Sequence, residues 1–512
     1  MKKEIVSLAF AVASSAALAA IEMGAPFSDG AVLQRGMKVP VWGTATAGNE
    51  IEVSFAGKSL ETTVSQDGSW RVDLPSMDAC SKGREMVVVE RESGWFGSKV
   101  DEKVLTDILV GEVWFASGQS NMETPIWHDG NSRYRDGKGA MMTAMTKLPL
   151  VRFIKTPRVY GTASRHKLKV QWQKFEPSSF VATHYSCHWK LLSAVAWYYA
   201  RELHLALGIP IGIVESSIGG TGIDAWTPRE GYEGCDPSIN SVAEYKPLFG
   251  KEWKRNDLYN APFQQPTSLF NAMVRDYTPM AMRGFIWYQG CNNNPESHLY
   301  RVKMHALYNG WAKAFENPSL KLYFAQLAPW QTNWMGICMA QTQFAAEQPN
   351  AAIAVTADVG NFDDIHPNDK ETVAQRLVIH ALKRDYGFDI PEDDSPVAKS
   401  LSVAGDVATV EFDNATFWYI YNLDMSLKAP FEIAGEDGVW KQAEIVVCKD
   451  CEKGWKALSF INHSALHLKS AEVKSPVAVR YLGRDRTSGV MYNQVALPLG
   501  PFEISLGAKK TK

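Results

Sequence analysis

The sequence predicts an α/β protein in which a three-layer parallel sheet occupies the middle of the chain and a β-sandwich domain flanks it on either side. Short alternating runs broken by turn residues fill positions 20–107, continuous apolar strands alternate with helical stretches over 108–388, and short strands return over 389–512. Strand–helix alternation is typical of a parallel sheet covered on both faces. Strands at a spacing of about ten residues are typical of sandwiches. A length of 512 residues is consistent with these three domains.

Composition excludes some partners. The chain has 53 Lys and Arg against 56 Asp and Glu, a formal net charge of −3, which provides no electrostatic reason to expect nucleic acid or an anionic membrane as partner. Hydrophobic residues make up 46% and charged residues 21%, as in ordinary globular proteins. Nothing in the sequence indicates the oligomeric state.

The first 19 residues predict a signal peptide. Lys2 and Lys3 precede an apolar run over 5–19 that ends in a small-x-small pattern at Ala17 and Ala19. A run of about 15 residues is too short to span a bilayer comfortably but suits the core of a signal peptide. We expect cleavage before Ala20, export to the periplasm or the extracellular space, and no membrane span.

The seven cysteines do not form a dense framework. They lie at positions 80, 187, 235, 291, 338, 448 and 451. The Cys448 and Cys451 pair could be half of a zinc site, but no second pair of suitable spacing follows it. A local disulfide or two free thiols is the favoured interpretation. We predict no metal and no cofactor.

The N-terminal domain is predicted from strands at 39–43, 51–55, 70–74 and 86–90, with turn residues between them. The central domain is predicted from apolar strands at 111–116, 209–214, 284–288, 322–327 and 352–356. Helices are expected at 193–207, where Gly208 supplies a C-cap, and at 369–384. A charged, proline-bounded linker at 391–396 precedes C-terminal strands at 407–412, 444–447 and 477–481.

The first chemical motif follows the strand at 111–116. It reads Ser117-Gly118-Gln119-Ser120-Asn121-Met122. A serine at the carboxyl edge of a sheet is a candidate nucleophile, because its hydroxyl and its backbone N–H face the same crevice. Ser120 could instead be an N-cap that opens a helix, or serve both purposes. The lipase-type Gly-x-Ser-x-Gly elbow is absent.

The second motif can supply the base that a nucleophilic serine needs. Asp363, Asp364 and His366 lie between the last apolar strand and the expected helix at 369–384. An aspartate three residues before a histidine can orient the imidazole through Nδ1 while Nε2 reaches the serine. The alternative is an acidic loop that caps the helix, with a solvated histidine.

Two further loops end strands on the same predicted edge. Gly219 and Gly220 can offer backbone N–H groups, and Asn293 can offer a side-chain amide. Such donors stabilise the oxyanion of acyl transfer. Each loop alone is a weak signal, because glycine and asparagine in turns are mostly structural.

Together the loops resemble the SGNH hydrolases and, within them, the sialate O-acetylesterase family. The resemblance covers nearly the whole mature chain. Its segments are 27–35 and 40–43, 117–122, 216–221 with Ala225-Trp226, 286–290 with Asn293, 326–329, 364–367 and 493–502.

The resemblance implies roles for individual residues. Ser120 would be the nucleophile, His366 the general base and then acid, and Asp363 the carboxylate that orients the imidazole, with Asp364 also available. The oxyanion hole would consist of the Ser120 N–H, Gly219 or Gly220, and Asn293. Three polar neighbours in the same motifs are expected to bind substrate: Gln119, Asn121 and Gln289.

The resemblance further implies an exported serine esterase that removes O-acetyl groups from an O-acetylated glycan, with O-acetylated sialic acids as the first expectation. Ile218 replaces a common Trp, and Cys291-Asn292 replaces a usual Glu-Ser pair, so acetylxylan or another polysaccharide is an alternative substrate. From other classes, the alternatives are a non-catalytic carbohydrate-binding protein and an exported peptidase or lipase. Several aromatic and basic residues lie near the loops and could bind a sugar, although core packing is favoured for Trp287: Trp127, Trp226, Trp287, Trp330, Arg133, Arg135 and Arg229.

Overall fold

The structure is a computed structural model of the whole chain. It describes residues 20–94, 97–125, 147–159, 167–176, 191–233, 264–331, 334–360, 362–416, 418–421, 430–446, 460–461, 464–483 and 490–507. The expected signal peptide, Trp127, Arg133, Arg135 and four of the seven cysteines lie outside these residues.

The middle of the chain forms the predicted parallel sheet. Its strands lie in the order β10 (Gln173–Lys174), β9 (Val151–Lys155), β11 (Ile211–Ser217), β8 (Lys99–Gly118), β12 (Gly284–Tyr288), β13 (Lys321–Ala325) and β14 (Ala351–Ala354). All neighbours on this path pair in parallel except β9 and β10. The inner strands are buried along most of their length, as their continuous apolar sequences require.

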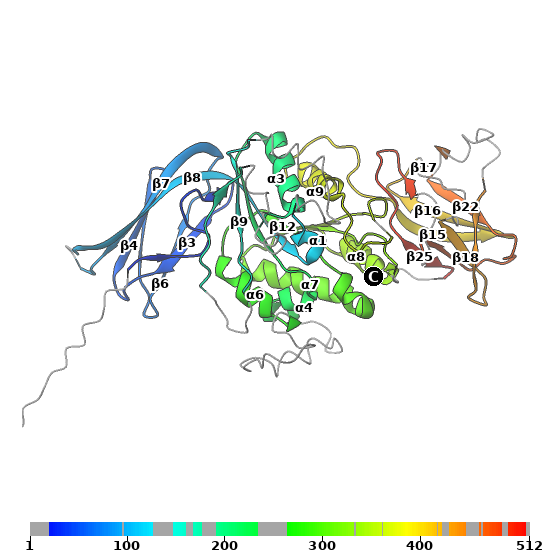
Figure 1. The fold of residues 1–512 in the computed structure, drawn as a ribbon, viewed down its shortest axis with the longest axis horizontal. Coiled ribbons are helices and arrows are strands. Elements are labelled where there is room, and N and C mark those ends of the chain that lie inside the picture. The colour runs from blue at the N-terminus through cyan, green and yellow to red at the C-terminus, as the bar shows by residue number, and fades with distance from the viewer. Residues whose placement is uncertain are drawn as a thin grey trace, which may run out of the picture.

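Helices cover both faces of this sheet (Figure 1). On one face lie α3 (Ala194–Leu207) and α9 (Lys370–Arg384), and on the other lie α4 (Ile223–Trp226), α6 (Ser268–Met273) and α7 (Ser297–Ala314), with α8 (Met335–Glu347) packed against α7. Both predicted long helices are confirmed. Ser193 caps α3 by accepting the Ala196 N–H, and Gly208 ends it with a φ of 66°. Shorter helical turns are α1 (Ser120–Glu123), η3 (Arg229–Tyr232), η6 (Arg275–Tyr277) and η7 (Cys291–Glu296).

Among the described residues, the N-terminal part contributes one separate sheet and a group of strands that join the central sheet through β8. One sheet holds β1 (Glu22–Met23), β3 (Val39–Thr44) and β6 (Ser69–Leu74). The other strands are β2 (Val32–Gln34), β4 (Glu50–Phe55), β5 (Lys58–Thr63) and β7 (Cys80–Arg91), which join β8 directly or through one another. The expected boundary at 107/108 therefore falls inside a continuous strand, at Asp107, whose φ is 57°.

The described residues of the C-terminal part form three antiparallel sheets. The first sheet holds β15 (Val397–Ala404), β16 (Val407–Asp413), β22 (Ala465–Lys469) and β20 (Glu444–Ile445). The second holds β21 (Phe460–Ile461), β17 (Trp418–Tyr421) and β24 (Val490–Tyr492). The third holds β19 (Trp440–Gln442), β18 (Phe431–Ala434), β23 (Ala478–Tyr481) and β25 (Phe502–Ser505). Tyr492 connects this part to the central domain, because its hydroxyl donates to Asp358 Oδ2 at 3.1 Å. The two β parts lie at opposite ends of the molecule (Figure 1).

The topology places the loops that carry the predicted site residues at one edge of the sheet. The chain passes from β8 to β9 and β11 on one side, and then crosses to β12, β13 and β14 on the other side. Ligands of open parallel sheets bind outside the carboxyl ends of the strands at such a switch point, which here is the end of β8. Among the described residues, no helix is both long and apolar enough to cross a membrane.

Candidate active site

Ser120 lies directly beyond the end of β8, at the first position of α1. Gly118 permits this turn, since its φ is 144° and a Cβ at this position would lie 2.3 Å from the Tyr288 carbonyl oxygen. The Gln119 N–H donates to the same carbonyl oxygen at 3.1 Å. The turn is thus fixed against β12, and Ser120 is held half-buried at the sheet edge.

His366 reaches Ser120 from the loop between β14 and α9. Its Nε2 lies 2.9 Å from Ser120 Oγ, a hydrogen-bonding distance. The structure therefore brings together the predicted nucleophile and the predicted base. A histidine nitrogen in this position can take the hydroxyl proton when the oxygen attacks an acyl carbon.

Two aspartates precede the histidine, and they make different contacts. Asp364 Oδ1 accepts the His366 backbone N–H at 3.0 Å and lies 3.7 Å from His366 Nδ1. Asp363 is exposed, and its Oδ1 accepts a long hydrogen bond of 3.4 Å from Gln331. A separation of 3.7 Å is too long for a hydrogen bond to Nδ1. The assignment of the orienting carboxylate to Asp363 stays a prediction. Asp364 is a second candidate, because it contacts the His366 backbone N–H directly.

The glycine loop after β11 lies beside the nucleophile. A Cβ on Gly219 would be 3.3 Å from the Ser120 Cβ. The Gly219 N–H donates to Glu123 Oε2 at 2.9 Å, so this group can serve an oxyanion only after it leaves the carboxylate. Gly220 follows with a φ of 73°. Of the two predicted glycines, Gly220 is the better candidate donor.

Glu123 was not foreseen from the sequence. It is buried in the same short helix as Ser120, and Arg158 binds its other oxygen through Nε at 2.9 Å. An arginine beside a buried carboxylate compensates its charge. The Glu123–Arg158 ion pair therefore positions the Gly219 loop against the nucleophile turn.

Asn293 lies in η7, and its side-chain oxygen accepts two hydrogen bonds. Oδ1 accepts the Ile223 N–H at 2.9 Å and the Gln289 amide at 2.7 Å, and Nδ2 donates to Glu296 Oε1 at 2.6 Å. An amide nitrogen carries two hydrogens, so the orientation fixed by the oxygen leaves a second N–H that a ligand can accept.

The three residues expected to bind substrate are buried, and each makes a hydrogen bond to a neighbouring loop. Gln119 Oε1 accepts the Gly290 N–H at 3.1 Å, and Gln289 donates to the Thr221 carbonyl oxygen at 3.0 Å. Asn121 donates to the Ile365 carbonyl oxygen at 3.0 Å. The exposed fractions are 3% for Gln119, 2% for Asn121 and 0% for Gln289, and their role in substrate binding stays a prediction.

Lys370 is a second residue that the sequence did not single out. It is 2% exposed at the start of α9, and burial lowers the pKa of its ammonium to about 7. Burial likewise raises the pKa of the nearby Cys291 thiol to about 11, although Lys370 acts in the opposite direction. A lysine one residue after a capping aspartate is usually solvated, so only the packing of α9 against the nucleophile turn could have revealed it.

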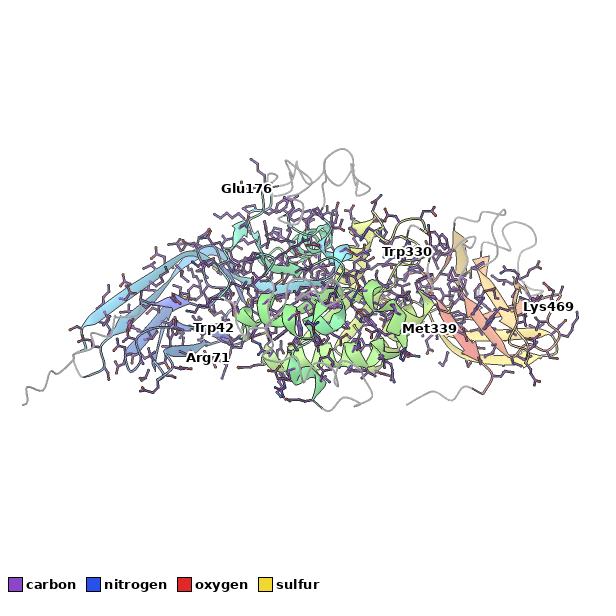
Figure 2. All side chains as sticks on the ribbon, turned by 60° about the horizontal axis from the view of Figure 1, so that its bottom comes forward. Trp42, Arg71, Glu176, Trp330, Met339 and Lys469 are labelled. Atoms are coloured by element: carbon purple, nitrogen blue, oxygen red, sulfur yellow. The ribbon has the colours of Figure 1, made fainter. Side chains whose placement is uncertain are left out.

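A small cavity of about 20 Å³ lies beside the site. Trp330 contributes to its wall, and Figure 2 shows this residue in the central domain on the side toward the C-terminal strands. Trp226 and Trp287 are fully buried, which confirms the core role favoured for Trp287. The cavity is lined by Asn121, Cys291, Asn294, Leu327, Ala328, Trp330, Trp334 and Ile365.

One group of side chains in the described part of the chain could supply metal ligands. His380, Asp393 and Asp394 offer ligand atoms within 4.8 Å of one another. Arg384 donates to both aspartates, and Lys383 contacts Asp393 at 3.0 Å, so basic side chains already compensate the acidic charge. The absence of a metal requirement stays a prediction. Cys80, Cys291 and Cys338 are free thiols, and the other cysteines lie outside the described residues.

Several known proteins resemble the chain in sequence and in structure. The family profile described as "Carbohydrate esterase, sialic acid-specific acetylesterase" matches residues 110–383. The sialate O-acetylesterase of Rattus norvegicus is 26% identical over 517 residues, covering 90% of this chain and 90% of that protein. The human sialate O-acetylesterase is 27% identical over 380 residues, covering 68% of this chain and 67% of that protein.

A crystal structure of a carbohydrate acetylesterase from Xanthomonas citri is similar over 95% of this chain and 100% of that chain, with a TM-score of 0.75 and 27% identity. The profile covers more than half of the chain, including β11, β12 and the loops that carry Ser120 and His366. The chain therefore belongs to the sialic acid-specific acetylesterase family of carbohydrate esterases, and it is a carboxylic ester hydrolase.

Proposed function

We propose that the protein is an exported serine esterase that removes O-acetyl groups from O-acetylated sialic acids through an acetyl-enzyme intermediate. The observation that carries the proposal is the 2.9 Å contact between Ser120 Oγ and His366 Nε2. The names of the relatives from rat and human support the substrate class.

In the first half of the reaction, Ser120 Oγ attacks the acetyl carbon while its proton passes to His366 Nε2. The carbonyl oxygen becomes an oxyanion that accepts from the Ser120 N–H, the loop at Gly219 and Gly220, and the Asn293 amide. When the tetrahedral species collapses, the bond to the sugar oxygen breaks, and His366 returns the proton to that oxygen. The sugar leaves with a free hydroxyl, and the acetyl group stays on Ser120.

In the second half, water replaces the sugar. His366 takes a proton from the water as its oxygen attacks the acetyl carbon, and the same donors hold the second oxyanion. Collapse breaks the bond to Ser120 Oγ, which recovers its proton from His366. The products are acetate and free enzyme, and no redox partner is needed.

A second substrate class is acetylxylan or another acetylated polysaccharide. The observation in its favour is the pair Cys291-Asn292, where the family commonly has Glu-Ser, together with the likeness to a carbohydrate acetylesterase of unspecified substrate. Acetate release from O-acetylated sialoglycans and from acetylated xylan, measured at equal acetyl concentration, decides between them. A higher kcat/KM on the xylan would replace the sialic acid proposal.

The non-catalytic alternative does not agree with membership in an esterase family, and a binding protein has no need to keep a hydroxyl and an imidazole in hydrogen-bond contact. Export makes a separate prediction. N-terminal sequencing of protein collected outside the cytoplasm should begin at Ala20, and an intact Met1 on that protein would contradict the proposed cleavage.

A further inference from the structure

Lys370 occupies a position that is unfavourable for a cation. It is the first residue of α9, where the partial positive charge of the helix terminus lies, and it is almost completely buried. Burying an ammonium group costs free energy unless polar partners replace the lost water. The side chain therefore needs a compensating contact.

That contact is Asn121, the residue directly after the candidate nucleophile. Lys370 Nζ donates to Asn121 Oδ1 at 2.5 Å, and the ammonium lies 5.2 Å from the centre of the Tyr288 ring, within the range of a cation–π interaction. Tyr288 ends β12, the strand against which the nucleophile turn is fixed. Lys370 thus contacts two groups that define the position of Ser120.

The two contacts of Asn121 determine which way its amide faces. The Ile365 carbonyl oxygen can only accept, so the amide nitrogen points to it and the amide oxygen points to Lys370, whose amine can donate in either protonation state. The nitrogen then donates to the Ile365 carbonyl oxygen at 3.0 Å. Ile365 is the residue directly before His366, so this hydrogen bond joins the nucleophile turn to the histidine loop.

We propose that Lys370 is a positioning residue that acts through Asn121 to keep the His366 loop in place against Ser120. The proposal rests on the esterase function proposed above. If Lys370 loses its donor, the Asn121 amide is free to rotate, the bond to Ile365 weakens, and the Ser120–His366 distance is no longer fixed. A misplacement of about 1 Å can lower a rate by about 100-fold.

The first test compares two lysines of the same helix. Lys370→Met should lower kcat by about 10- to 100-fold and leave KM within about twofold, since the residue does not touch substrate. Lys383→Met, on the last turn of α9, is the matched control and should keep the wild-type kcat. The rate at which a fluorophosphonate labels Ser120 should fall in parallel with kcat in Lys370→Met, because labelling also needs the Ser120–His366 contact.

The second test is a double-mutant cycle. Asn121→Leu removes the residue through which Lys370 is proposed to act. If that proposal is right, the double variant Lys370→Met/Asn121→Leu should be no slower than Asn121→Leu alone. Lys370→Gln, whose amide can still donate to Asn121, should recover part of the loss. If Lys370→Met does not fold, Lys370→Gln takes its place in the cycle, and the same non-additivity is required.

The outcomes separate this inference from the proposed function. A folded Lys370→Met with wild-type kcat and wild-type labelling, or additive losses in the cycle, would overturn the role of Lys370 while wild-type acetate release stands. A wild-type protein that releases no acetate from any acetylated glycan would instead overturn the proposed function. The labelling of Ser120 would still test the role of Lys370 in that case, because the fluorophosphonate probe does not depend on the sugar.

Discussion

His366 Nε2 lies 2.9 Å from Ser120 Oγ, although the two residues are 246 positions apart in the chain. The contact exists because β8 and β14 end at the same edge of the parallel sheet, so the loops that follow them meet. Asn121 and Ile365, the immediate neighbours of the two residues, are joined by a second hydrogen bond. Two hydrogen bonds, one between Ser120 and His366 and one between their neighbours, therefore hold the two loops together without substrate.

Replacing either member of the pair should remove nearly all covalent catalysis. We expect Ser120→Ala and His366→Ala each to lower kcat by about 10⁴ to 10⁶, and the double variant to add little, because the two side chains act as a unit. Initial rates of acetate release measure the effect, and a thermal melt of each variant checks the fold. A well-folded Ser120→Ala variant with full activity would refute the mechanism.

Asn293 should affect the transition state more than the bound substrate. We expect Asn293→Ala to lower kcat by about 10² to 10³ with KM nearly unchanged, because an oxyanion exists only in the transition state. The alanine also removes the oxygen that accepts from Ile223 and Gln289. Asn293→Asp keeps that oxygen and removes the donor, but its second carboxylate oxygen would face Glu296 Oε1, so a low kcat is assigned to the missing donor only when the melting temperature stays close to wild type. An Asn293→Asp enzyme with normal kcat would exclude this role.

The two aspartates before His366 should differ in their effects. Asp364 Oδ1 already accepts the His366 backbone N–H, a contact that Asn at this position can keep, so Asp364→Asn should lower kcat only modestly. Asp363→Asn should lower kcat more, because an aspartate three residues before the histidine suits Nδ1 better. Steady-state kinetics of both variants on one acetyl ester provide the comparison. The reverse ranking would transfer the orienting role to Asp364.

Hydrolysis should not depend on a metal ion. The cluster of His380, Asp393 and Asp394 is compensated by Arg384 and Lys383, and the proposed chemistry uses only side chains and backbone N–H groups. Activity after dialysis against EDTA should equal that of the untreated enzyme. A loss that one particular metal ion restores would show that the site is misassigned.

The sequence predicts those parts of the site whose signal is local. Ser120 and His366 each follow an apolar strand and lie in a recognisable motif, and the two helices that the sequence predicts carry their caps in the adjacent residues, Ser193 and Asp369. The parallel sheet is likewise readable from the alternation of strands and helices. Its strand order is not readable in this way, because β8 is one strand that pairs with N-terminal strands at its start and with central strands at its end.

The remaining features depend on contacts between distant segments. Glu123 and Lys370 are charged residues in helical first turns, a pattern typical of solvated surfaces, and only the packing of the loops buries them. Gln119, Asn121 and Gln289 have the polarity of substrate-binding residues, but each donates to or accepts from backbone groups of a neighbouring loop. Polarity in a motif therefore identifies the site without separating residues that contact the ligand from residues that hold the loops.

The buried Lys370 should give the stability of the protein a characteristic pH dependence. Its pKa is about 7 in the folded protein, compared with an ordinary value of 10.5, because of burial, while Cys291, Asp364 and Asp369 act in the opposite direction. Between pH 7 and 10.5 the unfolded chain binds a proton at this lysine that the folded chain does not bind. The free energy of unfolding should therefore rise with pH in this window, by up to about 1.4 kcal/mol per pH unit for one proton, and the penalty should be fully present below pH 7. Cys291 titrates in the same range, so the comparison is made between Cys291→Ala and Cys291→Ala/Lys370→Met by urea unfolding at pH 7, 8, 9 and 10. The first protein should gain stability relative to the second as the pH rises, whereas equal slopes would mean that Lys370 keeps its proton in the folded state.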